Sequence, residues 1–461
     1  MSDGMDFDGA ELGTLAARES SGGWLDGLLR RAVLSRLRAL EHGELIFLEG
    51  TQRHVFGQAL SSEEPQVARE APSAREDGDG LGLSATVQVQ DPRFYRRLAL
   101  GGALGAADAY MDGLWTTDDL TAVVRVLARN RAALDRLETG MARLSGPLQR
   151  LIHRLRDNTR TGSRRNISAH YDLGNDFYQL FLDETMMYSC AVFEQGALEE
   201  SAGEADPERA GEVLAHASRA KLDLICRKLE LGPEDHVLEI GTGWGGFAVH
   251  AAEHYGCRVT TTTISRRQYE FAAERVRRAG LEDRVTILLE DYRDLQGRYD
   301  KLVSIEMIEA VGDRYLELFF RRCSELLKPE GMMLLQAITI ADQAYHRYRR
   351  SVDFIQRYVF PGSCVPSVEA MSRCLARATD LRLFHLHDIT PDYATTLRLW
   401  RRRFLDNLAK VRELGFGERF VRMWEYYLCY CEGGFQERVI GDVQMLLTKP
   451  LCRRDPVAVR V

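Results

Sequence analysis

The chain has 461 residues, of which 45% are hydrophobic and 28% charged. This length exceeds one ordinary domain, and the composition is typical of a soluble globular protein with ample core-forming residues. It excludes a wholly disordered chain, a collagen-like chain and a coiled coil. The 61 basic and 68 acidic residues leave a formal charge of −7, so the chain as a whole is not expected to bind nucleic acid.

The sequence was searched for membrane-spanning segments, a signal peptide and paired cysteines. No stretch approaches the roughly 20 consecutive apolar residues that a membrane-spanning helix needs, and the first twenty residues lack the apolar core of a signal peptide. A cytoplasmic location is therefore expected. The nine cysteines are scattered without a C-x-x-C pair, which predicts reduced thiols and neither a zinc site nor a disulfide framework.

The first part of the chain is predicted to form a small domain. Residues 1–22 are expected to be a disordered tail, and residues 23–124 a domain with short strands and helices. A polar, acidic stretch at 61–84 predicts a flexible insertion. The alternating sequence at 85–90 predicts a strand, and a Gly-rich segment then leads into a helix that begins near Asp118.

A strongly basic segment follows at 125–165. It contains eleven arginines and three acidic residues, a local charge of +8 in a net-negative chain. Leucines recur in it at roughly helical spacing, and Gly146 and Pro147 are expected to divide it into two helices. A basic amphipathic helix suits an anionic membrane surface, whereas composition alone also allows a solvated interdomain linker.

Beyond residue 166 the pattern alternates between strands and helices. This alternation predicts a catalytic domain over 166–461 with helices on both faces of a parallel sheet, the doubly wound α/β class with about seven strands. The expected strands are 236–240, 257–264, 284–290, 301–306, 331–339, near 381–388 and 439–447, and the intervening helices are 246–255, 266–280 and 315–328.

The strand His236–Ile240 runs directly into the glycine-rich sequence GTGWGG at 241–246. Such a loop lets a ligand approach the backbone at the carboxyl edge of the sheet. Glu239 precedes the first glycine by two residues, giving the E-x-G-x-G-x-G form typical of S-adenosylmethionine (SAM) methyltransferases. The acidic residue that usually contacts the ribose about twenty residues later is absent, and Thr263 and Gln268 could take its place. A dinucleotide site and a purely structural turn remain as alternatives.

Several longer motifs resemble the cyclopropane-fatty-acyl-phospholipid synthase family. They are HYDLGNDFY from His170, YSCA from Tyr188, EIGTGWGG, TTTISRRQ, LLEDYRDL, IEMIEAVG over 305–312, YVFPGSCVPS, DYATTLRLW and RMWEYYLCYCEGGF. The resemblance covers roughly residues 90–450 and includes the N-terminal segment of the phospholipid-using branch. It implies the class I SAM-methyltransferase fold, a doubly wound seven-stranded sheet, with a smaller N-terminal α+β domain.

The resemblance also implies where the cofactor binds and which residues act. The cofactor pocket would be lined by Tyr188, Ser189, Glu239, Gly241, Gly243, Trp244, Gly245, Gly246, Thr263, Ile264, Gln268, Asp291 and Tyr292. In this family SAM methylates a cis double bond, and a bound bicarbonate is thought to remove a proton so that a ring closes. The expected bicarbonate cradle is Cys190, Glu309, Gln336, the backbone of Ile338, and Tyr393. Cys431 matches a cysteine sometimes proposed as catalytic, although its aromatic helix also suits a packing role.

One departure from the family bears on the product. Gln336 stands where the family carries histidine, and glutamine cannot titrate; Ala310 likewise replaces a histidine in many members. We therefore expect cyclopropanation of unsaturated phospholipid acyl chains, with methylation or methylenation without ring closure as the alternative. A non-catalytic lipid- or partner-binding protein is the alternative of another class. Peripheral association with the inner face of the cell membrane is expected, and the sequence allows a homodimer.

Overall fold

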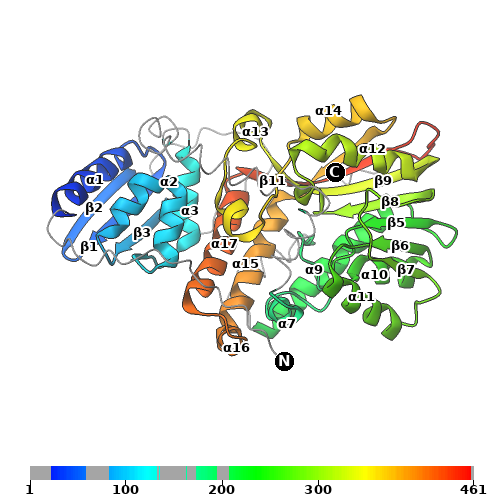
Figure 1. The fold of residues 1–461 in the computed structure, drawn as a ribbon, viewed down its shortest axis with the longest axis horizontal. Coiled ribbons are helices and arrows are strands. Elements are labelled where there is room, and N and C mark those ends of the chain that lie inside the picture. Colours follow the sequence, from blue (N-terminus) through cyan, green and yellow to red (C-terminus); the bar gives the residue numbers. More distant parts are fainter. Residues whose placement is uncertain are drawn as a thin grey trace, which may run out of the picture.

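The computed structural model describes residues 22–58, 82–131, 134, 162, 173–194 and 207–457. Two sheets organise these residues, a four-stranded one near the N-terminus and a seven-stranded one in the rest of the chain. Figure 1 shows the small sheet and its helices at one end of the molecule and the large sheet at the other, with helices α15 and α17 between them. Within the described residues, no helix is long and apolar enough to cross a membrane.

The N-terminal sheet has the strand order β2-β1-β3-β4, with β1 antiparallel to β2 and parallel to β3. Helix α2 begins after Pro92 and is kinked at Gly102, whose φ is 55° and ψ −136°. Helix α3 is capped by Asp119, which accepts a hydrogen bond from the Ala122 backbone N–H at 2.9 Å. The elements are α1 (Gly22–Leu37), β1 (Gly43–Glu49), β2 (Gln52–Gln58), β3 (Ser84–Val89), α2 (Arg93–Met111), β4 (Trp115–Thr116) and α3 (Leu120–Arg129).

The large sheet has the order β10-β11-β9-β8-β5-β6-β7. It is mixed and not wholly parallel, because β11 runs antiparallel to both of its neighbours. The antiparallel direction of β11 brings its first residues to the edge at which the parallel strands end. The strands are β5 (His236–Ile240), β6 (Arg258–Thr262), β7 (Val285–Leu288), β8 (Tyr299–Ile305), β9 (Leu327–Ile340), β10 (Arg382–Asp388) and β11 (Ile440–Thr448). The seven-stranded doubly wound fold is confirmed.

Helices cover both faces of this sheet. One face packs on α9 and α10, through a core that includes Val237, Phe247 and Leu446. The other packs on α12 and α14, through Phe319, Met371 and Leu375. The remaining elements are α7 (Asn175–Gln179), α9 (Pro207–Lys228), α10 (Gly246–Tyr255), α11 (Arg266–Arg278), η2 (Ile308–Ala310), η3 (Asp313–Tyr315), α12 (Leu316–Leu326), α13 (Asp342–Tyr348), the π-helical turn η4 (Ile355–Val359), α14 (Val368–Ala378), α15 (Thr390–Asp406), α16 (Leu408–Glu413) and α17 (Glu418–Gln436).

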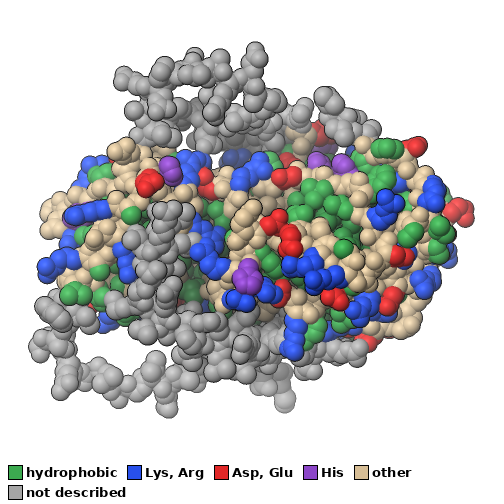
Figure 2. All heavy atoms as spheres, turned by 90° about the horizontal axis from the view of Figure 1, so that it is seen from above, with side chains coloured by type: hydrophobic (Ala, Val, Ile, Leu, Met, Phe, Trp, Pro, Cys, Tyr) green, Lys and Arg blue, Asp and Glu red, His purple; other side chains and the backbone are tan. Residues whose placement is uncertain are grey.

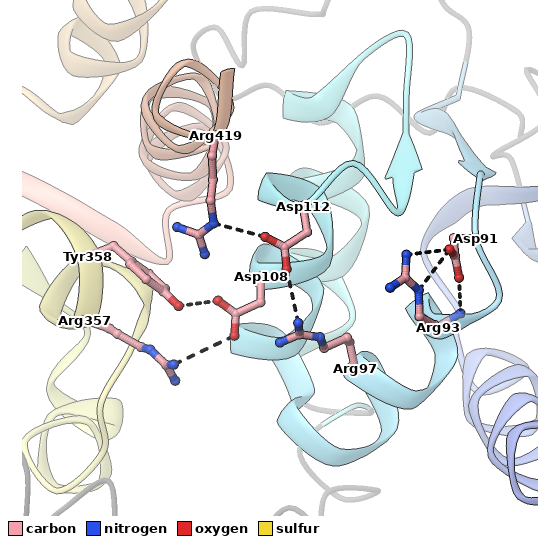
Figure 3. A network of polar contacts seen from close by, with 8 residues as sticks. All are labelled: Asp91, Arg93, Arg97, Asp108, Asp112, Arg357, Tyr358 and Arg419. Atoms are coloured by element: carbon pink, nitrogen blue, oxygen red, sulfur yellow. Dashed lines mark hydrogen bonds and ion pairs between the residues drawn. The ribbon is translucent and has the colours of Figure 1, made fainter. Parts of the chain in front are cut away.

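Polar contacts fasten the end of α2 to the catalytic domain. Asp108 accepts a hydrogen bond from the Tyr358 hydroxyl and lies 3.9 Å from the Arg357 guanidinium. Asp112 pairs with Arg419 of α17 at 3.0 Å. Figure 3 shows these carboxylates pointing from α2 toward the neighbouring domain. The two domains therefore share a specific polar interface in addition to an apolar one.

The start of the basic segment takes part in the same interface. Arg125 and Arg129 both lie 2.7 Å from the carboxylate of Glu437, just beyond α17. These two arginines therefore hold the domains together and do not form part of a free basic surface, contrary to our expectation for this end of the segment. Most of 125–165 lies outside the described residues. On the face in Figure 2, Lys and Arg side chains are interspersed with Asp and Glu.

Candidate functional site

The glycine-rich loop connects β5 to α10 at the carboxyl edge of the large sheet. Gly241 and Gly243 have φ values of 105° and 52°, a region that side chains rarely adopt. A Cβ added to Gly243 would meet no atom within 4 Å, whereas one added to Gly246 would lie 2.8 Å from Met187 Sδ and from Thr185 O. Gly243 thus leaves space for a ligand, and Gly246 allows close packing of the chain behind the loop.

A cavity of about 950 Å³ opens beside this loop. Its size suits a cofactor together with part of a second substrate. Of the expected cofactor residues, Gly245 and Gly246 do not line the cavity. Those that do are Tyr188, Ser189, Glu239, Gly241, Gly243, Trp244, Thr263, Ile264, Gln268, Asp291 and Tyr292. Their roles toward SAM stay predictions.

Polar groups are concentrated at the loop end of the cavity. The Glu239 carboxylate is buried and accepts a hydrogen bond from the Thr261 hydroxyl at 2.6 Å. Burial raises the pKa of Glu239 to about 8. The Thr263 hydroxyl donates to the Gln268 side chain at 2.9 Å, so the two residues proposed to replace the missing acid lie together. These groups fit the hydroxyl and amino groups of a nucleoside.

The centre of the site is Glu306, at the end of β8. Its Oε1 accepts hydrogen bonds from the Cys190 backbone N–H at 2.7 Å and from Gln336 Nε2 at 2.8 Å. Its Oε2 accepts a hydrogen bond from the Tyr393 hydroxyl at 2.6 Å. Glu306 lines the cavity and adopts a φ of 47°, an uncommon backbone conformation for a residue with a side chain and one often found at functional sites.

A second carboxyl group lies behind Glu306. The fully buried Asp442, at the start of β11, accepts a hydrogen bond from Gln336 Nε2 at 3.1 Å, and its carboxyl group lies close enough to Glu306 to interact with it electrostatically. Burial and the neighbouring Glu306 carboxyl raise the pKa of Asp442 well above its usual range. Two adjacent buried carboxyl groups favour a state that retains a proton between them. The fully buried Lys221, which donates to the Ser189 hydroxyl at 2.7 Å, partly offsets their negative charge.

Glu309 lies one turn beyond Glu306 and faces the same cavity. Its Oε1 accepts a hydrogen bond from the Ile338 backbone N–H at 2.6 Å, and its buried Oε2 has no hydrogen-bond partner. Burial, followed by the Glu306 charge, raises the pKa of Glu309 to about 8. A neutral carboxyl group at pH 7 can donate one hydrogen bond to a ligand through that second oxygen.

The groups expected to cradle bicarbonate do not form an open anion site. The Cys190 N–H, the Gln336 amide and the Tyr393 hydroxyl all bind Glu306, and the Ile338 N–H binds Glu309. Cys190 and Gln336 are fully buried and do not line the cavity. A fixed side-chain carboxylate therefore occupies the centre of the expected cradle, and these residues do not fit a bicarbonate ion.

The two cysteines of interest have different positions. The Cys190 thiol donates to the Ala191 carbonyl at 3.1 Å, and burial raises its pKa well above the usual range. Cys431 lines the cavity from α17, and burial raises the pKa of its thiol also. Because the thiolate is the reactive form, both environments favour a packing role over a nucleophilic one.

Sequence reasoning missed Glu306, Asp442 and Lys221. Glu306 lies in the quoted motif IEMIEAVG, where two glutamates three residues apart follow the β8 strand. Only the second was assigned, although both are placed to reach the edge of the sheet. Asp442 and Lys221 carry no local signal, because their place depends on how β11 and α9 pack.

Comparison with known proteins identifies the family. Residues 158–445 match the family model described as mycolic acid cyclopropane synthetase. The chain belongs to this family. It is 39% identical to tuberculostearic acid methyltransferase UfaA1 from Mycobacterium tuberculosis, over 77% of this chain and 81% of that protein. It is 35% identical to cyclopropane-fatty-acyl-phospholipid synthase from Escherichia coli K12, over 79% and 88% respectively.

Solved structures of the family agree with this assignment. Mycolic acid cyclopropane synthase CmaA1, complexed with SAH and CTAB, is 30% identical, with a TM-score of 0.55 over 62% of this chain and 98% of that one. The cyclopropane synthase MmaA2 from Mycobacterium tuberculosis has the same TM-score at 28% identity. The chain is therefore a SAM-dependent C-methyltransferase that modifies fatty acyl groups.

Proposed function

We propose that this enzyme transfers a methyl group from SAM to the cis double bond of an unsaturated phospholipid acyl chain and releases the product without closing a ring. This reading replaces our first expectation of cyclopropanation. The observation that carries it is Glu306, whose carboxylate takes the hydrogen bonds expected to hold bicarbonate. The 39% identity to a tuberculostearic acid methyltransferase supports it as well.

The cofactor supplies an electrophilic methyl group when it is bound. Gly241, Gly243 and Trp244 of the loop would hold its amino-acid end, and Glu239, Thr263 and Gln268 its nucleoside. The protein must also orient the weakly nucleophilic double bond and keep water away from the cation that forms. The aromatic side chains of Tyr188, Trp244 and Phe360 line the cavity and suit a positively charged intermediate.

Glu306 is the proposed general base. Methyl addition to one olefinic carbon places the positive charge on the other, and a hydride shift brings it to the methylated carbon. Loss of a proton from the new methyl group to Glu306 then gives a methylene branch, and the lipid has gained one CH₂. Burial raises the pKa of Glu306, which favours proton acceptance, and the three hydrogen bonds fix the carboxylate relative to the chain.

Product analysis tests the proposal directly. The gene is expressed in a host that lacks such enzymes, and proton NMR is recorded on the lipids. Vinylic signals from a methylene or methyl-branched alkene are expected. Upfield cyclopropane signals without vinylic ones would overturn the proposal and restore ring closure. A lipid mass increase of one CH₂ is common to both outcomes and serves as the check for turnover.

Membrane association is part of the same proposal. The lipid substrate lies in bilayers, and the basic residues that follow Arg129 in the segment 125–165 favour an anionic surface on the inner face of the membrane. A homodimer is proposed as well, and the molecular mass measured by analytical ultracentrifugation tests it. Neither point enters the chemistry assigned to Glu306.

A further inference from the structure

The cavity extends far beyond the cofactor loop, into the N-terminal domain. Its lining includes Leu37 of α1, Leu45 and Phe47 of β1, Val87 of β3 and Val123 of α3. The same cavity reaches Glu306, Tyr393 and the glycine loop. One continuous space therefore joins the interior of the small domain to the place where the methyl group is transferred, and neither the cofactor nor Glu306 accounts for its N-terminal part.

The sequence of α2 keeps this space open. The helix is kinked at Gly102, and the small residues Gly102, Ala103 and Ala106 line the cavity. Glycine at this position permits the φ of 55° that breaks the helix. Protein interiors are normally packed without large voids, so small residues around an apolar space indicate room kept for a ligand.

The cavity lining reaches the protein surface at this helix, and we infer that the mouth of the channel lies there. Ala103 is exposed and Gly102 is half-exposed, whereas Leu104 and Phe94 further along the cavity lining are buried. Arg36 and Arg131 line the cavity in this domain as well, and Asp353, which interacts electrostatically with Arg131, lines it from the catalytic domain. The lining thus combines basic side chains with apolar walls, a pattern that matches a phosphate head group joined to an acyl chain.

Domain contacts make the passage a fixed part of the molecule. Helix α17 contributes Tyr426, Tyr430 and Gly434 to the cavity wall and packs against α2 and α3. A Cβ on Gly433 would lie only 2.7 Å from Val124 of α3, so the two helices approach closely. The passage therefore runs along a tightly packed interface and does not depend on a gap between loosely joined domains.

We propose that the N-terminal domain is the entry channel for the substrate: the ester-proximal half of the phospholipid acyl chain lies between α2, α3 and the small sheet, with the head group at the mouth near Arg36 and Arg131. This inference rests on the proposed function, because it takes the lipid acyl chain as the substrate. It assigns part of the substrate binding to the small domain. Both domains would then determine how the acyl chain is positioned at the site of methyl transfer.

Photolabelling of the full chain tests the channel without turnover. The enzyme, saturated with S-adenosylhomocysteine, is irradiated with vesicles of a phosphatidylglycerol that carries a diazirine near the acyl ester, and labelled peptides are mapped by mass spectrometry. Label on peptides from 93–131 is expected. A second probe with the diazirine at the methyl end should label the catalytic domain. Ester-end label found only in 173–194 or 207–457, or methyl-end label in 93–131, would overturn the proposal.

A matched pair of substitutions on α2 adds a functional readout. Ala103→Trp places a bulky ring at the mouth, whereas Leu100→Trp places one at an exposed position outside the cavity lining. Ala103→Trp is expected to reduce turnover on vesicles at least tenfold and to suppress the 93–131 label, with S-adenosylhomocysteine affinity unchanged. Equal turnover and label in the two variants would refute the channel. If the wild-type enzyme shows no turnover but the label is still found on 93–131, the result would count against the proposed function alone.

Discussion

Replacing Glu306 by glutamine separates the role of its charge from the role of its hydrogen bonds. A glutamine carbonyl in place of Oε1 can accept from the Cys190 N–H and from Gln336 Nε2, as the carboxylate does at 2.7 and 2.8 Å. The amide NH₂ then faces the Tyr393 hydroxyl, which can accept where it now donates at 2.6 Å. All three contacts survive, so we expect the free energy of unfolding to change by no more than about 1–2 kcal/mol.

The catalytic effect should be much larger than the effect on stability. A positioned general base contributes typically about 10²–10⁴-fold to a rate, equivalent to roughly 3–5 kcal/mol of barrier. We expect kcat on oleoyl-phospholipid vesicles to fall by that factor, while calorimetric affinity for S-adenosylhomocysteine stays within about twofold. Glu270→Gln on the exposed face of α11 is the matched control. Turnover of Glu306→Gln within threefold of wild type would refute the general-base assignment.

The same reasoning predicts a chemical rescue. Glu306→Gly removes the carboxylate at a position whose φ of 47° glycine adopts without strain. The Cys190 N–H, the Gln336 amide and the Tyr393 hydroxyl would then be left without the anion they now bind. Added bicarbonate or formate should restore part of the lost turnover, measured as release of S-adenosylhomocysteine. Rescue by chloride to the same extent would show a salt effect and contradict this account.

Three further predictions follow from other parts of the molecule. Gly243→Val should lower S-adenosylhomocysteine affinity at least a hundredfold with a native circular dichroism spectrum, because the added side chain projects into open cavity space; unchanged affinity would contradict the cofactor assignment. Burial raises the Glu239 pKa from 4.5 to about 8. The unliganded protein should therefore lose stability as pH rises from 4.5 through 8, by an amount of the order of 5 kcal/mol. In urea titrations, Glu239→Gln should remove this pH dependence of the free energy of unfolding. Replacing Arg150, Arg154 and Arg156 by glutamine should weaken sedimentation with anionic vesicles at low salt, by about 1 kcal/mol per residue; equal binding to neutral and anionic vesicles would argue against it.

Local patterns in the sequence were sufficient for most of the large sheet. The strand at 236–240 and the helix at 246–255 have the predicted bounds, because an apolar run, a glycine turn and an amphipathic helix each carry their own signal. Strand β9 begins at Leu327 and not at 331, since Leu327 pairs with Tyr299 of β8. That extension depends on a neighbouring strand and leaves no mark on the segment itself.

The Gly-rich segment before Asp118 shows the opposite case. We predicted no helix or strand for this segment, yet α2 continues through it to Met111. Alanine and leucine favour the helix strongly, and the glycines are confined to one kink and to sites of close packing: a Cβ on Gly105 would lie 2.0 Å from the Arg97 carbonyl oxygen. Composition could not distinguish glycines that end a helix from glycines that bend one.

The carboxyl cluster could not be predicted because it is assembled by topology. Glu306, Gln336 and Asp442 come from three strands, and they meet only because β11 enters the sheet antiparallel beside β9. The motif resemblance pointed to Gln336 as a departure from the family, and that departure is explained by its hydrogen bond to Glu306. The sequence alone offered no reason to pair these two residues.

The packing of α17 against α3 also has a consequence for how the chain is made. Thr121 and Glu432, hydrogen-bonded at 3.2 Å, are separated by 311 positions, and Arg125 and Glu437 by 312. During synthesis the N-terminal domain leaves the ribosome long before the helix that completes its wall. At about 5–20 residues per second, it waits on the order of fifteen seconds to a minute with that apolar wall uncovered. Chaperone dependence should therefore be concentrated in this interval, and slowing translation after residue 131 should lower the yield of native enzyme more than slowing it after residue 436.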